Sequence, residues 1–139
     1  MKPEILRLNL LGPLLYAPSE SIALAYKQED GEKLFCFEIE ESQAQEFLPE
    51  KRHFPGALVF SGKALKEEEP SESILELPSG NYIFCQIREI LDEDGIIDLA
   101  VEAQNEGLWQ RLKLTKRLYV RFLFEESQGV TQIWRPYTE

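Results

Sequence analysis

Aromatic side chains that could line a ligand pocket are concentrated in the second half of the chain. Their positions are Tyr82, Phe84, Trp109, Tyr119, Phe122, Phe124, Trp134 and Tyr137. Aromatic rings supply a large contact area at low entropic cost, and they suit flat apolar or cationic ligands. The alternative is that these rings form a core with a partly exposed rim.

Strand periodicity assigns several of these residues to common faces. Successive side chains of a strand point to opposite faces, so Tyr119 and Arg121 share one face, and Arg121 could orient an acceptor group of a ligand. Gln132 and Trp134 likewise share a face of the last strand. We therefore expect any ligand site to be aromatic and to lie in the second half. The candidate residues are Tyr82, Trp109, Tyr119, Arg121, Gln132 and Trp134.

A cluster of basic residues stands out in this acidic chain. Its members are Arg111, Lys113, Lys116, Arg117 and Arg121. The cluster could hold an anionic ligand, and the alternative is that it balances the charge of the acidic loops.

No catalytic or metal-binding pattern is recognisable. The single histidine, His53, lies in a polar stretch, and Ser79 lacks the flanking pattern of hydrolase nucleophiles. One histidine and two cysteines cannot complete a Cys/His zinc site, and no spacing indicates an all-carboxylate one. We expect Cys36 and Cys85, both in apolar runs, to be reduced and buried. No glycine-rich phosphate loop is present, and we assign no catalytic residue, metal or cofactor.

Apolar periodicity and turn residues predict an α+β fold with a mixed, mostly antiparallel sheet and one main helix. The main helix is expected within residues 92–112, with Asp92 at its start and Gly107 ending or kinking it. A short helix is expected at 41–48, stopped by Pro49. Strands are expected at 5–11, 22–26, 34–39, 57–60, 74–77, 82–87, 118–124 and 130–137.

Length and charge indicate one acidic domain. The 139 residues suffice for a single domain, with halves at 1–65 and 74–139 joined by an acidic linker at 66–73. The net charge of −10 disfavours binding to nucleic acid or to an anionic membrane surface. We see neither a signal peptide nor a stretch apolar enough to span a membrane, and we expect a cytoplasmic protein.

Two segments carry a resemblance to a known family. The run Leu77-Pro78-Ser79-Gly80-Asn81-Tyr82 resembles a strand start of GyrI-like effector-binding domains, and residues 130–136 are similar to that family's final strand. The resemblance covers residues 74–137. It implies two pseudo-repeated strand–helix–hairpin units with an aromatic pocket between them that binds small organic molecules. An acidic residue common in the family's closing strand aligns with Gln132, which disfavours strong selectivity for cations.

Three functional hypotheses follow. The first is a stand-alone domain that binds a small aromatic or amphipathic molecule in an aromatic pocket. The second is a non-enzymatic interaction module that contacts a protein partner through an acidic surface or a sheet edge. The third is a small hydrolase, which would need a buried carboxylate such as Glu76 or Glu102 near a polar cleft. The residues favour a role other than catalysis.

Overall fold

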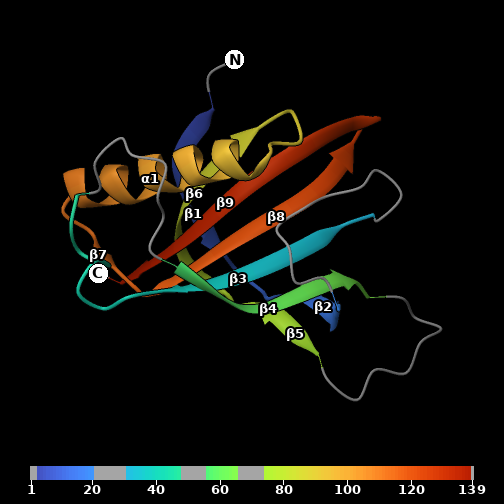
Figure 1. Cartoon of the computed structure of the whole chain (residues 1–139), viewed down its shortest axis with the longest axis horizontal. Helices are drawn as coiled ribbons and strands as arrows, with labels where there is room; N and C mark the ends of the chain where they lie inside the picture. The colour runs from blue at the N-terminus through green and yellow to red at the C-terminus, as the bar shows by residue number, and fades with distance from the viewer. Residues whose placement is uncertain (1–2, 21–30, 48–55, 66–73, 139) are drawn as a thin grey trace.

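The computed structural model of this chain describes residues 3–20, 31–47, 56–65 and 74–138. These residues form a curled sheet and one helix, α1 (Glu93–Trp109), which packs on one face of the sheet (Figure 1). The strands are β1 (Glu4–Leu10), β2 (Leu14–Pro18), β3 (Lys33–Ile39), β4 (Gly56–Ala64), β5 (Leu75–Leu77), β6 (Gly80–Ile87), β7 (Lys113–Leu114), β8 (Arg117–Glu125) and β9 (Gln128–Thr138).

The strand order β1-β6-β9-β8-β3-β4-β2-β5 is symmetric about its centre, where β8 pairs with β3. Strands β6, β8 and β9 of the second half correspond in position to β2, β3 and β4 of the first half. Every strand pairing within the described ranges is antiparallel. The predicted α+β fold, with a mostly antiparallel sheet and one main helix, is therefore confirmed. The segment between β2 and β3 lies mostly outside the described residues.

The N-terminus of α1 is capped as the sequence predicts. The carboxylate of Asp92 accepts a hydrogen bond from the backbone N–H of Gly95 at 2.8 Å. Glu93 and Asp94 add negative charge in the first turn, where the helix dipole favours it.

The helix continues past Gly107, so the predicted break at this residue is wrong. Gly107 allows close packing, because a Cβ there would lie 2.7 Å from a methyl carbon of Leu114 and that side chain would have to shift. The helix ends instead at Trp109, with Gln110 as its C-cap, and the next residue, Arg111, adopts a left-handed conformation with φ of 62°. The N–H groups of Arg111 and Leu112 bond to the carbonyls of Leu108 and Gly107, both at 2.9 Å, which is a Schellman arrangement.

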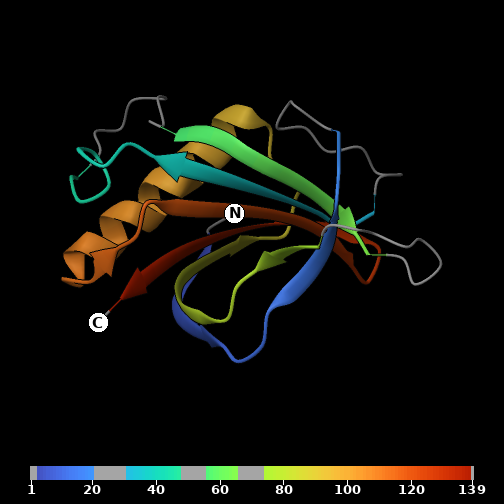
Figure 2. The ribbon, with the colours of Figure 1, turned by 90° about the horizontal axis from the view of Figure 1, so that it is seen from below.

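The face of the sheet under α1 carries the larger apolar core. Strand alternation places Val120 and Phe122 of β8 in this core and Tyr119 on the opposite face. Figure 2 shows the sheet curling so that β1, β2, β5 and β6 wrap round the face opposite α1. Other buried members of the core are Phe35, Ile39, Ile83, Ile96, Leu99, Ala103 and Ile133.

Arg135 is fully buried in this core. Its Nη1 donates to Gln104 Oε1 at 2.7 Å, and its Nη2 donates to the carbonyls of Thr115 at 2.8 Å and Ala44 at 3.3 Å. Its Nε has no partner among the described residues. Burial away from water lowers the pKa of Arg135 to about 9. The side chain thus links β9, α1 and the segment after β3.

The predicted helix at 41–48 is wrong for its described part, because residues 41–46 form turns. Hydrogen bonds such as Gln43 N–H to Glu40 O close these turns over three residues. Gln104 Nε2 donates hydrogen bonds to the carbonyls of Gln43 and Glu46. In a continuous helix these carbonyls would instead accept from backbone N–H groups four residues later.

Other expectations have mixed outcomes. Strand β2 and the short β7 were not predicted, since Gly12 and Pro13 indicated a break rather than the start of a strand. The expected strand at 22–26 and the linker at 66–73 lie outside the described residues. Cys36 and Cys85 are free and buried, which confirms that prediction. In the described part of the chain no helix is long and apolar enough to cross a membrane.

Candidate ligand-binding site

Directly opposed residues of five neighbouring strands place a row of side chains on the face opposite α1. The row runs through Phe84 of β6, Trp134 of β9, Tyr119 of β8, Cys36 of β3 and Phe60 of β4. Opposed residues of antiparallel strands point to the same face, so these side chains form one continuous band. We call it the aromatic row.

Trp134 lies at the centre of the aromatic contacts. Its ring centroid is 4.8 Å from that of Phe84 and 5.3 Å from that of Tyr82, both in edge-on geometry. Tyr82 in turn contacts Tyr119 at 6.4 Å. Such edge-to-face pairs add stability beyond the area that they bury. The side chains of Tyr82 and Trp134 are 1% and 4% exposed.

Two residues further along the strands, the same face becomes polar. Gln86 of β6 opposes Gln132 of β9, which opposes Arg121 of β8. Gln132 Oε1 accepts from Arg121 Nη1 at 3.1 Å and from Trp134 Nε1 at 3.0 Å. Gln132 Nε2 donates to Gln86 Oε1 at 2.7 Å. We call Gln86, Gln132 and Arg121 the polar row.

Two residues of the first half, Tyr16 and Glu32, form hydrogen bonds with Arg121 of the polar row. Arg121 donates to Glu32 Oε1 from Nη2 at 2.7 Å and from Nε at 2.9 Å. The hydroxyl of Tyr16 donates to the same oxygen and accepts from Arg121 Nε at 2.8 Å. Gly62 leaves room for Tyr16, because a Cβ at Gly62 would lie 2.9 Å from Tyr16 Cβ.

Burial sets the ionisation of this face. Loss of water raises the pKa of Tyr16, Tyr82 and Tyr119 well above the ordinary tyrosine value. It also raises the pKa of the Cys36 thiol, although Arg117 Nη1 donates to Cys36 Sγ at 3.4 Å. These groups are therefore protonated at neutral pH, and none is an activated nucleophile. The charge of Arg121 is compensated by Glu32.

The structure brings five of the six predicted site residues together. Tyr82, Tyr119, Arg121, Gln132 and Trp134 all lie on the face opposite α1. Trp109 does not join them, because it lies in the last turn of α1 and is 78% exposed. Sequence reasoning missed Gln86, Tyr16 and Glu32. The alternation Tyr82, Phe84, Gln86 could have identified Gln86, whereas the other two depend on the pairing of distant strands.

The carboxylates considered for a hydrolase do not lie in a buried site. Glu76 and Glu102 are both exposed. The pKa of Glu102 is raised mainly by desolvation and further by the nearby Asp98. Glu102 and Asp98 lie on α1, outside the aromatic and polar rows. Within the described ranges no group of three or more His, Cys, Asp or Glu could hold a metal ion.

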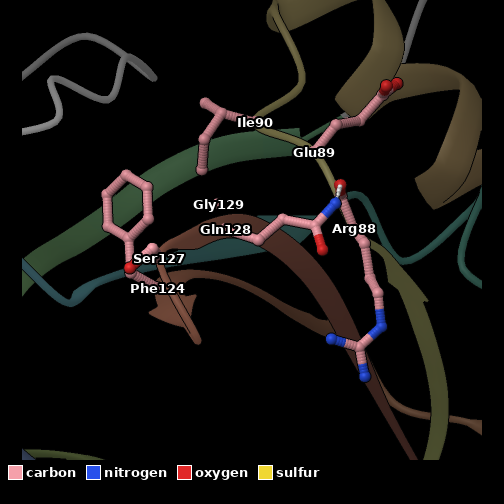
Figure 3. Close-up of a pocket in the computed structure, with 7 residues that line it drawn as sticks. All are labelled: Arg88, Glu89, Ile90, Phe124, Ser127, Gln128 and Gly129. Atoms are coloured by element: carbon pink, nitrogen blue, oxygen red, sulfur yellow. Dashed lines mark hydrogen bonds between the residues drawn. The ribbon is translucent and has the colours of Figure 1, made fainter.

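A separate shallow hollow of about 480 Å³ lies where the β8–β9 hairpin meets residues 88–90 (Figure 3). Gln128 Nε2 spans it to donate to the carbonyl of Arg88 at 2.7 Å. Phe124 and Ile90 supply its apolar surface. It contains none of the six predicted residues and no charged group held in a buried position, so we do not assign a ligand to it.

Comparisons with known proteins add little to this geometry. No protein-family model matches the chain, and no curated protein matches it. Among solved structures, the chain is similar to SAV2435 bound to tetraphenylphosphonium. The TM-score is 0.47 with 8% sequence identity, over 99% of this chain and 94% of that chain. At this TM-score and identity, the ligand of SAV2435 says nothing about a ligand of this chain.

Proposed function

We propose that the protein binds small, flat, largely apolar molecules on the sheet face opposite α1. Trp134, Tyr82 and Tyr119 contact the ligand, and Gln132 and Arg121 orient it. The observation that carries this proposal is the polar row lying beside the aromatic row on a face that is otherwise apolar.

A face that only had to pack would be expected to be apolar, because burial of polar groups costs free energy unless they are hydrogen-bonded. Gln132 is 4% exposed and is held by Arg121, Trp134 and Gln86. Fixed donors and acceptors beside aromatic rings are typical of small-molecule sites, where they provide orientation.

The side chains and strands beside this face bear on how a ligand would reach it. Partly buried side chains pack against the aromatic cluster, among them Leu8 and Leu10 of β1 and Leu75 of β5. β1 and β5 are the two edge strands, and in the described residues they do not pair with each other. We place the entry of the ligand between these two edges, where no strand pairing of the described residues has to break.

Calorimetric titration with 2-naphthylmethanol, a flat neutral probe, tests the proposal. We expect saturable binding in the micromolar to millimolar range. Trp134→Phe removes the indole N–H that bonds Gln132 and reduces the ring area, so it weakens binding about tenfold. Trp109→Phe is the matched control, because Trp109 is exposed on α1, and it leaves the affinity unchanged.

Two results would contradict the proposal. One is the absence of binding at millimolar probe concentration. The other is equal sensitivity to Trp134→Phe and Trp109→Phe, which would place any binding on the exposed helix end.

A second candidate function is the binding of a protein partner by strand addition. The outer edge of β1 pairs with no strand in the described part of the chain, and Ile5 and Leu6 on it are 36% and 39% exposed. An unpaired edge of this kind can accept an added strand. Ile5→Lys and Leu6→Lys would abolish such binding in a sedimentation assay with the partner, while Trp134→Phe would not affect it.

A further inference from the structure

Three hydrogen-bond donors of the proposed site converge on one acceptor atom. Arg121 Nη2 and Nε lie 2.7 and 2.9 Å from Glu32 Oε1, and the Tyr16 hydroxyl donates to the same oxygen. The Arg121 side chain is 16% exposed, so this convergence lies largely out of water. Hydrogen bonds from a guanidinium to an anionic oxygen are among the strongest in proteins.

The carboxylate of Glu32, which accepts these hydrogen bonds, is more exposed to solvent than the Arg121 side chain that donates to it. The Glu32 side chain is 34% exposed, about twice as much as that of Arg121. Its backbone is hydrogen-bonded to β4, because the Glu32 carbonyl accepts from the N–H of Ala64 at 3.0 Å. Rotation of the side chain alone would therefore transfer the carboxylate to water without disturbing β3 or β4.

We propose that Glu32 is an internal occupant of a carboxylate-binding position, and that the ligands of the site are aromatic carboxylates. This inference rests on the proposed function. The ring of the ligand lies against Trp134 and Tyr119, and its carboxylate replaces that of Glu32 on Arg121 and Tyr16.

The spacing of the two rows fits such a ligand. Tyr119 and Arg121 are two residues apart on one strand, which is about 7 Å. Trp134 Nε1 and Arg121 Nη1 already share Gln132 Oε1 as acceptor, so the indole and the guanidinium are neighbours. A cationic ring has no anionic group that could replace the carboxylate of Glu32 on Arg121, so it gains none of these hydrogen bonds. Acidic side chains elsewhere on the molecule have little effect on a ligand carboxylate, because physiological salt screens exposed charges over about 8 Å.

The test compares three probes with the same ring and different charge: 2-naphthoate, 2-naphthylmethanol and 2-naphthylmethylammonium. In calorimetric titrations of the unmodified chain we expect 2-naphthoate to bind about tenfold more tightly than the alcohol, and the ammonium to bind most weakly. This comparison needs no variant, so it stands even if a substitution impairs folding.

Two pairs of variants locate the effect. Glu32→Gln removes the competing carboxylate and raises the affinity for 2-naphthoate about tenfold, with less effect on the alcohol. Glu125→Gln is its control, because Glu125 pairs with Arg88 at 3.5 Å on the exposed hairpin side. Arg121→Gln removes the preference for 2-naphthoate over the alcohol, whereas Arg88→Gln preserves it.

Failure of this inference and failure of the proposed function give different results. If the alcohol binds but 2-naphthoate binds no more tightly, or if Glu32→Gln weakens 2-naphthoate, the carboxylate assignment is overturned and the small-molecule site remains. If none of the three probes binds, both are overturned.

Discussion

Substitution of Gln104 by leucine should destabilise the fold strongly, because this buried side chain joins three parts of the molecule. Gln104 is fully buried, and its Oε1 accepts from Arg135 Nη1 at 2.7 Å. Its Nε2 donates to the carbonyls of Gln43 at 2.9 Å and Glu46 at 2.6 Å. Leucine has a similar volume but leaves all three partners without these bonds.

The size of the loss follows from the kind of bond. A hydrogen bond to a charged group contributes about 1.5–3 kcal/mol, and each neutral one contributes about 1 kcal/mol. We therefore expect Gln104→Leu to lower the free energy of unfolding by about 4 kcal/mol, a large part of the total stability of a small domain. Urea unfolding monitored by circular dichroism measures this change.

A double-mutant cycle with Arg135→Met tests the physical reason. Much of the cost of Gln104→Leu comes from leaving the buried guanidinium of Arg135 with one acceptor fewer. Once Arg135 is methionine, that part disappears, so the two substitutions should couple by about 2 kcal/mol. Additive effects, within about 0.5 kcal/mol, would refute the reasoning, since they would mean that Arg135 does not depend on Gln104.

Three further predictions concern stability. In Gly62→Ala the added Cβ would lie 2.9 Å from Tyr16 Cβ, so Tyr16 has to shift, and the substitution should cost about 1–3 kcal/mol in urea unfolding. Gly12→Ala, whose added Cβ meets nothing within 4 Å, should cost far less, and equal effects would contradict this packing. Ser127 has φ of 67°, so Ser127→Gly should stabilise the chain by about 1 kcal/mol, and a lower thermal midpoint would be the opposite of the expected result. Burial raises the pKa of the three tyrosines on the ligand face, so above about pH 10 the folded chain keeps phenol protons that the unfolded chain releases. The free energy of unfolding should therefore fall as pH rises through this range, and a flat profile between pH 9 and 11 would show that these hydroxyls are accessible.

Local sequence patterns predicted the parts of the site that depend on one strand at a time. Alternation along β8 and β9 correctly placed Tyr119 with Arg121, and Gln132 with Trp134, on common faces. The N-terminal cap at Asp92 also follows from neighbouring residues alone. Local rules suffice here because side-chain direction in a strand has a period of two.

The remaining features depend on contacts between distant parts of the chain. Tyr16 and Glu32 reach Arg121 across 105 and 89 residues, through strand neighbours that no local pattern specifies. Gly107 suggests a helix end, but the helix continues through it, and its lack of a side chain lets Leu114 pack closely against it. Because the helix continues, Trp109 lies at its exposed end and away from the aromatic row.

The most direct test of the proposed ligand site uses the two indole N–H signals of the protein in ¹⁵N-correlated NMR spectra. The chain has two tryptophans, and Trp109→Phe assigns the signals. The Trp134 N–H lies within the site and bonds Gln132, whereas Trp109 is exposed on α1. During titration with 2-naphthylmethanol, the Trp134 signal should shift with saturation and the Trp109 signal should stay in place. A shift confined to Trp109, or no shift of either signal at millimolar probe, would contradict a ligand site on the face opposite α1.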